Sequence, residues 1–455
     1  MARSSLRDVA FPCVTRSSTF ILYLLLRACD TSTIGFLQAQ DAEYAADFSA
    51  LVAASHASEL PAGLSSTCKG QGAAPSLLPE VQLASGLMMG ATAAQQTCGS
   101  TNTCIVPAGT TLRMDSNLDV AALIIRGTLI WDDETQAAAE QWLCAGYVAA
   151  EEGAEMNVSV SNGAAYIFIK ANGAAHQDLG ARALGGVRAN MWLAGRPLRR
   201  TWSLLAESAM AAATSITLLH DPVAMGWRVG DRLMLAPTTS RSSGTADAVV
   251  IAGYGAGNTV RLSSALVAAY AAEFRAAGAG HGAPLSAEVI NLSRNLLITG
   301  DDLSLVNPCV ASSTAATCTY GLHTALMYGG SMSVEYARVE KCGQRGIGAR
   351  YCMHLHLLGA CPGCVLRGNA VEHSHQRGIV VHGTHGALVA ENVLADVRGA
   401  GIYLEDGNEM VNRIVHNVVI CPWAREGSMR GCTVPGTDNV EADTSLNQVA
   451  LAATL

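Results

Sequence analysis

The sequence predicts an all-β protein whose C-terminal part is a right-handed parallel β-helix, with few and short helices. Between residues 350 and 421 the chain holds short apolar runs, each closed by Gly, Asn, Asp or His. No run is long enough for an ordinary helix, and several are dominated by β-branched residues, which favour strands. The runs recur with a period in the low twenties, which is typical of a solenoid whose coils cover one another's apolar sides.

Recurring residues define the length of a coil. Asn369, Asn392 and Asn417 follow one another at this period, and each precedes two apolar residues. Gly378 is followed by isoleucine, and the same pair returns one period later at Gly401. Because asparagine tolerates the left-handed conformation and bonds its own backbone, we expect the three asparagines to occupy sharp corners of the coils.

Histidines are concentrated in the same stretch, which holds seven of the twelve in the chain. Aligning successive coils on their shared Gly-Ile pair places His382 level with Glu405, and level residues of neighbouring coils lie about 4.8 Å apart. His354 and His356 alternate along a strand, so both point to the same side of it. We therefore expect one ladder or cleft that is rich in imidazole and carboxylate groups.

The amino-acid composition limits the possible fold classes and the possible binding partners. Half of the 455 residues are hydrophobic and 15% are charged, a balance that excludes disorder throughout the chain. Glycine is abundant, at 45 residues, and phenylalanine is scarce, at 6, which suits thin coils with tight corners. The formal net charge is -8 with no long basic run, so we expect no nucleic-acid partner.

The N-terminal segment, 1–40, resembles a weak signal peptide. Arginines precede a short apolar run, Phe20–Leu26, and the small residue Ala28 follows it, although Arg27 interrupts the pattern. We expect a secreted or cell-surface protein, with an unprocessed start as the alternative. No stretch reaches the ~18 apolar residues of a membrane span, so we expect any membrane attachment to use a segment absent from this chain.

Fourteen cysteines include four close pairs in loop-like sequence. The pairs are Cys98 with Cys104, Cys309 with Cys318, Cys361 with Cys364, and Cys421 with Cys432. Such pairs favour disulfides and an oxidising compartment, and the alternative is a cytosolic protein with scattered thiols. Glycosylation sequons at Asn157 and Asn291 favour the extracellular alternative.

The segment before the repeats is also rich in strands and resembles the G8 domain, a β-rich module named for its glycines. The matching features are the Pro-Ala-Gly turn at 107–109, the hydrophobic-Arg-Gly-Thr-Leu strand at 125–129 and later strands punctuated by glycine. The resemblance runs from about Thr103 to Gly195. We expect Glu134–Cys144 to form a helical insertion within it.

Three motifs in the repeat region resemble the family of fibrocystin-L and the cell migration-inducing hyaluronidases. The motifs are Gly348–His356, His382–His385, and Leu404–Glu409 followed by Asn412. With the G8 segment, the resemblance covers roughly 103–450 and is nearest to the fibrocystin-L branch. Cys352 and Leu355 stand where the family usually has Pro and Phe, which changes the local turn but keeps the paired histidines.

The two branches of this family imply different functions. The fibrocystin-L branch implies a secreted or cell-surface protein without an established chemistry. The hyaluronidase branch implies cleavage of hyaluronan, and it brings calcium as a candidate cofactor. The sequence itself fixes no cofactor.

These features divide the chain into five segments. They are a signal peptide over 1–40, a helix and linker over 41–102, a G8 domain over 103–200, a β-rich connecting segment over 201–300, and parallel β-helix repeats over 301–455. Helices are expected at Gln40–Leu60 and Ser264–Ala277, with loop over 61–100. Because the pattern at Glu441–Asn447 still resembles a continuing coil, we expect the repeats to be truncated at the C-terminus.

The histidine and carboxylate set predicts either glycoside cleavage or a purely structural ladder of stacked polar residues. For cleavage, an acid would protonate the leaving oxygen, and a carboxylate would activate water or attack the sugar. The candidate catalytic residues are His354, His356, His382, Glu405, Asp406 and Glu409. The candidate substrate-binding residues are Arg350, Arg377, His385 and Tyr403, and Arg377 would hold a sugar carboxylate bidentately.

Metal binding has weaker support in the sequence. His354 and His356 are spaced to give two ligands on one side of a strand, but no strict pattern completes a site. Zinc would need a third or fourth ligand, whereas calcium would prefer Glu405, Asp406 and carbonyl oxygens. We therefore predict no metal site.

Three functions follow as hypotheses. The leading one is a secreted or surface-exposed protein that binds extracellular polysaccharide or glycosaminoglycan through its β-helix. The second is an endo-acting glycosidase on an acidic polysaccharide such as hyaluronan, and the third is an architectural ectodomain fragment. Catalysis becomes untenable if the side chains of His354, His382 and Glu405 point inward and are sealed by their neighbours.

Overall fold

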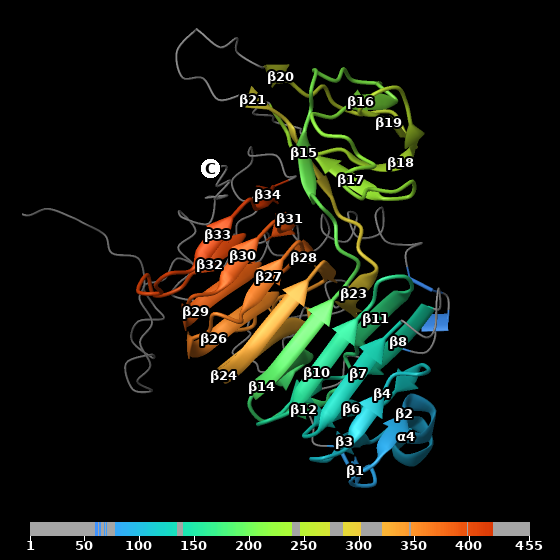
Figure 1. Ribbon diagram of the computed structural model, residues 1–455, viewed down its shortest axis with the longest axis vertical. Coiled ribbons are helices and arrows are strands. Elements are labelled where there is room, and N and C mark those ends of the chain that lie inside the picture. The colour runs from blue at the N-terminus through green and yellow to red at the C-terminus, as the bar shows by residue number, and fades with distance from the viewer. Residues whose placement is uncertain are drawn as a thin grey trace, which may run out of the picture.

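The computed structural model describes residues 60–61, 63–64, 68, 70, 78–133, 140–238, 246–273, 285–301, 321–344, 347–397 and 399–421. Strands dominate these residues, and successive turns of the chain pair in parallel, so the predicted parallel β-helix is confirmed. Figure 1 shows the coils stacked from the blue N-terminal end to the red C-terminal end. Each coil contributes to three parallel faces, which we name A, B and C.

Face A holds the first strand of each coil. Its strands pair in the order β1 (Glu80–Gln82), β3 (Thr103–Val106), β6 (Ala122–Ile125), β9 (Val148–Ala150), the first part of β14 (Ala183–Ala194), the first part of β24 (His323–Glu335), β26 (Met353–Ala360), β29 (Ile379–His385) and β32 (Ile402–Leu404). Strands β26 and β29, of eight and seven residues, are the longest of the described strands that belong to face A alone.

Face B follows face A around each coil. Its strands are β2 (Met88–Gly90), β4 (Thr111–Arg113), β7 (Thr128–Asp132), β10 (Glu155–Ser159), the second parts of β14 and β24, β27 (Val365–Arg367), β30 (Leu388–Ala390) and β33 (Arg413–Val415). The long strands β14 and β24 turn from A to B at a shift in register after Val187. Gly330 allows this turn, because an added Cβ would lie 1.9 Å from the Ala189 carbonyl oxygen and its φ is +91°.

Face C closes each coil. Its strands are β5 (Leu118–Asp119), β8 (Glu140–Ala145), β11 (Ala164–Ile169), β23 (Leu296–Gly300), β25 (Ala337–Glu340), β28 (Ala370–Ser374), β31 (Val393–Val397) and β34 (Val418–Ile420). A short antiparallel pair, β12 (Ala175–His176) and β13 (Gly180–Ala181), lies between β11 and β14 in the chain.

The core fills the inside of the coils along the whole stack. One continuous cluster of buried apolar side chains runs from Leu83 in the first coil to Ile402 in the last. Helix α4 (Ala91–Cys98) adds Ala91 and Ala94 to this cluster at the N-terminal end, where Figure 1 shows it beside β2. Since a coil cannot bury its apolar side alone, each coil depends on its neighbours.

An antiparallel domain is inserted between β14 and β23. Its six-stranded sheet contains β15 (Trp202–Leu204), β22 (Glu288–Asn291), β17 (Arg232–Leu235), β18 (Ala248–Tyr254), β19 (Thr259–Leu262) and β16 (Ser215–Thr217), beside the pair β20 (Ala272–Glu273) and β21 (Leu285–Ser286). Trp202, Met234 and Ile290 pack on Val393 and Val418 of face C. The coils therefore continue past the insertion, with strands of 103–194 and 323–415 in the same faces.

Buried ion pairs join the insertion to the β-helix. The guanidinium of Arg232 pairs with Glu372, and Arg338 Nε lies 3.0 Å from the same carboxylate. Arg338 Nη2 also lies 2.7 Å from Glu340. These side chains are at most 9% exposed, so removing one partner would leave an uncompensated buried charge.

Asparagines form a ladder at the corner between faces B and C. Asn369 Nδ2 donates to Asn392 Oδ1 at 3.0 Å, and Asn392 Nδ2 donates to Asn417 Oδ1 at 2.9 Å. The predicted left-handed conformation is wrong for these residues, because it belongs to the preceding residue in each coil: Gly368, Glu391 and His416. The asparagines instead bridge coils through their side chains, and their backbone is not the strained part of the corner.

Several expected elements differ in the structure. Residues 140–144 of the expected helix Glu134–Cys144 belong to strand β8, and residues 134–139 lie outside the described part of the chain. Residues 264–273 are irregular and end in β20, because alanine's helix preference is a weak prior that packing overrides. The expected loop over 61–100 contains β1, β2 and α4. The expected helix Gln40–Leu60 falls outside the described residues, apart from Leu60.

Two of the four predicted disulfides are confirmed, Cys98–Cys104 and Cys361–Cys364. Cys421 is disulfide-bonded, but its predicted partner Cys432 and the predicted pair Cys309–Cys318 lie outside the described residues. The sequence did not predict Cys68–Cys144 or Cys342–Cys352.

Two further features bear on the predicted location of the protein. Asn291 of the second sequon is fully buried and donates to Asp231, so the folded protein does not present it for glycosylation. Over the described residues, no helix combines the length and the apolar character that crossing a membrane requires.

Candidate functional site

The histidine and carboxylate cluster lies at the C-terminal end of face A, on three successive coils. His356 of β26 is in register with His382 of β29, and the Glu405 backbone N–H donates to the Val381 carbonyl at 3.0 Å just beyond β32. The sequence predicted that His382 and Glu405 occupy equivalent positions on successive coils. This register agrees with that prediction, since Val381 pairs with Leu404. Stacking thus brings together side chains that lie a whole coil apart in the sequence.

His354 and His356 point to the same side of β26, away from the core. Met353 and Leu355, which alternate with them, are buried in the main apolar cluster. The rings of His354 and His356 lie 4.7 Å apart, and those of His356 and His382 lie 4.8 Å apart. The strand period of two therefore creates a group of three imidazoles on the outer surface of face A.

The three imidazoles differ in burial. His354 is fully buried, the His382 side chain is 21% exposed, and His356 is intermediate. Burial lowers the pKa of His354 well below its ordinary value, with a further contribution from His356. Burial, together with the charge of His382, lowers the pKa of His356 to about 4. Both rings are therefore neutral near pH 7, and the sealed His354 cannot reach a substrate.

Two carboxylates approach the rings from the next coil. Glu405 Oε2 lies 3.6 Å from His382 Nδ1 and 3.9 Å from His354 Nε2. Glu405 Oε1 accepts a hydrogen bond from the Tyr351 hydroxyl at 3.2 Å. Asp406 is more exposed, at 45%, and its Oδ2 lies 3.2 Å from His382 Nε2. His382 is therefore held between two carboxylates.

Glu409 holds the loop in place. Its Oε1 accepts the backbone N–H groups of Gly383 at 3.0 Å and Asp406 at 3.2 Å. Burial raises the pKa of Glu409, but hydrogen bonds from its own backbone N–H and from those of Gly383, Asp406 and Gly407 outweigh burial and leave the pKa lowered overall. Glu409 is thus an ionised carboxylate that fixes the turn carrying Asp406, and this placement favours a positioning role.

The candidate substrate-binding residues Arg350, Arg377, His385 and Tyr403 all make contacts within the protein. Arg377 is 4% exposed and is used inside the protein, where its guanidinium lies 4.0 Å from the centroid of the Tyr403 ring and 3.5 Å from Glu405. Arg350 donates weakly to the Asp178 carbonyl at 3.4 Å, and burial lowers its pKa. His385 Nδ1 accepts from the Met410 backbone N–H at 2.9 Å.

Aromatic residues that the sequence did not single out complete the site. Tyr328 is 48% exposed, and its ring lies 5.8 Å from that of His356. Tyr351 is fully buried, and its ring lies 5.0 Å from that of His354. Tyr351 directly precedes the Cys-Met-His motif, which was the signal available in the sequence. Tyr328 sits at the bend of β24, where its φ is +64°, and no repeat pattern marks that position.

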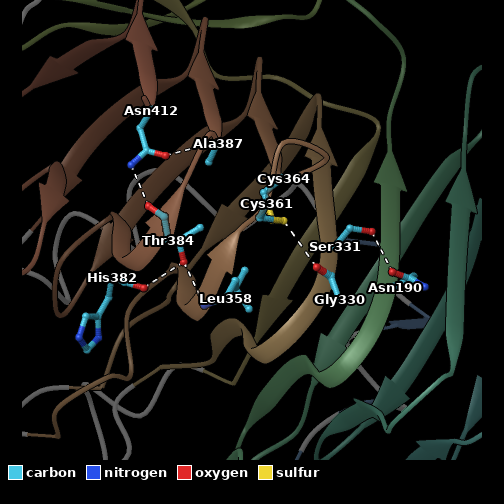
Figure 2. Close-up of a disulfide and its surroundings, with 10 residues drawn as sticks. All are labelled: Asn190, Gly330, Ser331, Leu358, Cys361, Cys364, His382, Thr384, Ala387 and Asn412. Carbon is cyan, nitrogen blue, oxygen red and sulfur yellow. Dashed lines mark hydrogen bonds between the residues drawn. A yellow bond between two sulfur atoms is a disulfide. The ribbon is translucent and has the colours of Figure 1, made fainter. Parts of the chain in front are cut away.

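Disulfides and hydrogen bonds fix the strands on either side of the cluster. Cys342–Cys352 anchors the start of β26, and Cys361–Cys364 closes the turn from β26 to β27. The Thr384 hydroxyl donates to the His382 carbonyl at 3.0 Å. Figure 2 shows the His382 ring directed away from Thr384 and from the Cys361–Cys364 disulfide. The Thr384 hydrogen bond and the Cys361–Cys364 disulfide thus hold the strand backbone on the side opposite the His382 ring.

The donor set does not fit calcium. Calcium takes six to eight oxygen ligands, whereas the cluster presents ring nitrogens of His354, His356 and His382 within 4.8 Å of one another. Of the nearby carboxylates, Glu409 already accepts two backbone N–H groups. Imidazole nitrogens with one or two carboxylate oxygens are instead the donors of zinc and related metals.

Comparisons with known proteins agree with the family resemblance found in the sequence. Residues 319–450 match the family model described as CEMIP beta-helix. The chain is 28% identical to fibrocystin-L of Mus musculus over 271 residues, which cover 53% of this chain and 6% of that protein. It is 31% identical to the cell surface hyaluronidase CEMIP2 of Homo sapiens over 170 residues, or 33% of this chain and 12% of that protein.

A G8 domain-containing protein of Dictyostelium discoideum is 26% identical over 223 residues, or 49% of this chain and 14% of that protein. The predicted resemblance to fibrocystin-L, to the hyaluronidases and to G8 proteins is thereby confirmed. The matched part of the chain spans 14% or less of the length of each of these three relatives.

Proposed function

We propose that this chain belongs to a secreted or cell-surface protein that binds an extracellular polysaccharide on the outer surface of face A. The observation that carries this proposal is the accessible edge formed by His356, His382, Asp406 and the exposed ring of Tyr328. Hydroxyl-rich sugars are bound by such polar groups beside an aromatic face. Disulfides and the resemblance to fibrocystin-L support an extracellular location.

The arrangement of the coils also suits a long ligand. Level side chains repeat about every 4.8 Å along the stack, so a chain-like molecule would meet equivalent positions on successive coils. Glu405, Asp406 and Glu409 carry negative charge at the C-terminal end of face A, while Arg350 lies within electrostatic range of the imidazoles. The affinity of the protein for glycosaminoglycans should therefore differ from its affinity for neutral polysaccharides.

Retention on immobilised polysaccharides tests this proposal. A panel should include hyaluronan, other glycosaminoglycans and neutral algal polysaccharides. Tyr328→Ala and His382→Ala should each weaken binding at least about fivefold, as expected for contacts worth more than about 1 kcal/mol. His416→Ala is the matched control, because His416 is an exposed histidine of the last coil that pairs with Glu391 at a different corner. Equal retention of all variants, or no retention of the wild type on any polysaccharide, would contradict the proposal.

Hydrolysis of the bound polysaccharide is a second candidate function. It is favoured by the two carboxylates that flank His382 and by the similarity to a protein named a cell surface hyaluronidase. Incubation with hyaluronan should then shorten the chains, as measured by light scattering, and Glu405→Gln should abolish the shortening. Binding without shortening would leave a binding module, and the absence of both would favour an architectural role.

A further inference from the structure

We propose that His354, His356 and His382 bind one divalent transition metal ion, with zinc best suited, and that Glu405 supplies the fourth ligand. The ligand atoms of the three histidines lie within 4.8 Å of one another on the outer surface of face A. His356, His382 and Asp406 also form the accessible edge proposed above for sugar binding, but zinc binding is measured without polysaccharide, so the two proposals can fail independently. Two observations about individual rings and one about the distances between donor atoms carry it.

The first observation is the orientation of His354. Its Nδ1 lies 3.1 Å from the Ala349 carbonyl oxygen, and since a carbonyl only accepts, Nδ1 carries the proton. The lone pair is therefore on Nε2, which makes no hydrogen bond within the described part of the chain although the residue is 0% exposed. A buried acceptor without a hydrogen bond destabilises the folded state. A metal at Nε2 would satisfy it.

The second observation is the orientation of His382. Its Nε2 lies 3.2 Å from Asp406 Oδ2, so the proton is on Nε2 and the lone pair is on Nδ1. Nδ1 accepts a hydrogen bond from His356 Nδ1 at 3.0 Å and lies 3.6 Å from Glu405 Oε2, so a metal at His356 Nδ1 would require the other tautomer of that ring. A carboxylate that binds the outer nitrogen of a metal-ligating histidine is a common second layer of support in metal sites. Asp406 would play that part here.

The third observation is how closely the donors match a tetrahedral ion. Zinc bonds imidazole nitrogen at about 2.0–2.1 Å, which places neighbouring ligand atoms about 3.3 Å apart. The distances of 3.0 Å between the Nδ1 atoms, 3.6 Å from His382 Nδ1 to Glu405 Oε2 and 3.9 Å from His354 Nε2 to the same oxygen bracket this value. Small rotations of the half-buried His356 and His382 rings would close the site around an ion.

The electrostatic setting is consistent with these distances. One carboxylate ligand and three neutral rings leave a net positive site with a metal dication, which the nearby Asp406 partly balances.

Zinc binding to the purified full chain tests the proposal. After removal of metal with a chelator and dialysis, titration with zinc chloride in a calorimeter should give one site per chain. His356→Ala and His382→Ala should each weaken the affinity at least about 100-fold, and Asp406→Asn should weaken it about 10- to 100-fold. His416→Ala should leave it unchanged.

A cobalt titration adds an independent readout. Cobalt(II) in a four-coordinate nitrogen and oxygen site gives intense visible absorption, which should appear in the wild type and be lost in His382→Ala. Circular dichroism identifies any variant that fails to fold. His354→Ala is the substitution with the greatest risk of misfolding, because His354 is fully buried. The test therefore depends on the variants of His356 and His382, which are only partly buried. Absence of a zinc site in the wild type, or zinc affinity unchanged in both His356→Ala and His382→Ala, would overturn the proposal.

Discussion

The asparagine ladder and the histidine cluster are two polar stacks on the same coils, and they differ in how their polar atoms are used. Each takes one side chain or more from every coil that it crosses. In the ladder, Asn392 Oδ1 accepts from Asn369, while its Nδ2 donates to the Leu366 carbonyl and to Asn417. In the cluster, His354 Nε2 makes no hydrogen bond within the described residues, and ring nitrogens of three histidines lie within 4.8 Å of one another.

This difference separates a structural stack from a site that is suited to a ligand. Inside a β-helix, identical side chains at level positions can satisfy one another, and the result is stability. A stack that leaves a buried acceptor without a hydrogen bond loses some of that stability. Substitutions in the two stacks distinguish a ladder that stabilises the fold from a cluster that depends on a ligand.

The largest effect is expected from Asn392→Ala. The change would remove the hydrogen bonds that the buried Asn369 backbone N–H and Leu366 carbonyl make to this side chain, and one of the two bonds made by the Asn369 amide and by Asn417 Oδ1. At about 1–3 kcal/mol for each unsatisfied group, the free energy of unfolding should fall by about 3 kcal/mol or more. Urea denaturation followed by circular dichroism measures it.

Asn258→Ala is the matched control for this substitution. Asn258 is partly exposed and its amide makes one hydrogen bond to the Leu219 carbonyl at 3.2 Å, so its removal should change the free energy of unfolding by about 0.5 kcal/mol or less. If Asn392→Ala were as mild as this control, the ladder would not be the stabilising element described above.

Zinc should stabilise the fold only through the cluster. At about 100 times its Kd, zinc should raise the free energy of unfolding by about 2.7 kcal/mol. The same increase is expected in Asn392→Ala, whose cluster is intact, but not in His382→Ala. Thermal denaturation with and without zinc measures it. Stabilisation that survives in His382→Ala would place the metal elsewhere.

Acid should destabilise the metal-free cluster. The pKa of His356 is lowered from 6.5 to about 4 in the folded chain, so the unfolded chain binds more protons between these values. Stability attributable to His356 is therefore lost as the pH falls from 6.5 toward 4. The groups that face this ring are His354, His382, Arg350 and Tyr328.

The measurable part of this effect is modest, because solvent screens a ring that is only half-buried. Between pH 7 and pH 5, the wild type should lose about 1 kcal/mol more than His356→Gln. Urea midpoints of both proteins at the two pH values provide the comparison. Parallel losses in the two proteins would show that His356 does not titrate with a lowered pKa.

The smallest effect is expected at the exposed ion pair of the last coils. His416 Nδ1 lies 3.0 Å from Glu391 Oε1, and the two side chains are 50% and 24% exposed. Glu391→Gln should change the free energy of unfolding by about 0.5 kcal/mol or less, since surface pairs are worth little. If the free energy of unfolding fell by more than about 1 kcal/mol in urea denaturation, stacking rather than burial would determine how much a polar pair contributes to stability.

The sequence predicted the coils wherever their length was regular. Ile379 pairs with Ile402, which is one period of the sequence repeat, and the level of His382 with Glu405 followed from that period. The two preceding coils are longer, because Met353 pairs with Ile379 and Thr324 pairs with Met353. The pairing of His356 with His382 was missed for this reason. A fixed period cannot locate partners where loops at the corners vary in length.

Other features left no local signal. The first coil has very short strands, β1 and β2, so it resembled a linker. Cys68 and Cys144 are far apart in the sequence and meet only because coils stack. The tautomers of His354 and His382, on which the metal site depends, are set by the Ala349 carbonyl and by Asp406, and such contacts appear only in three dimensions.

Anomalous scattering at the zinc edge, from crystals grown with zinc, tests the central claim most directly. The account predicts one strong peak within about 2.0–2.2 Å of His354 Nε2, His356, His382 and Glu405, with Asp406 on the outer nitrogen of His382. A cluster that carries no peak in crystals saturated with zinc, or a His354 ring turned with Nε2 toward the Ala349 carbonyl, would contradict it.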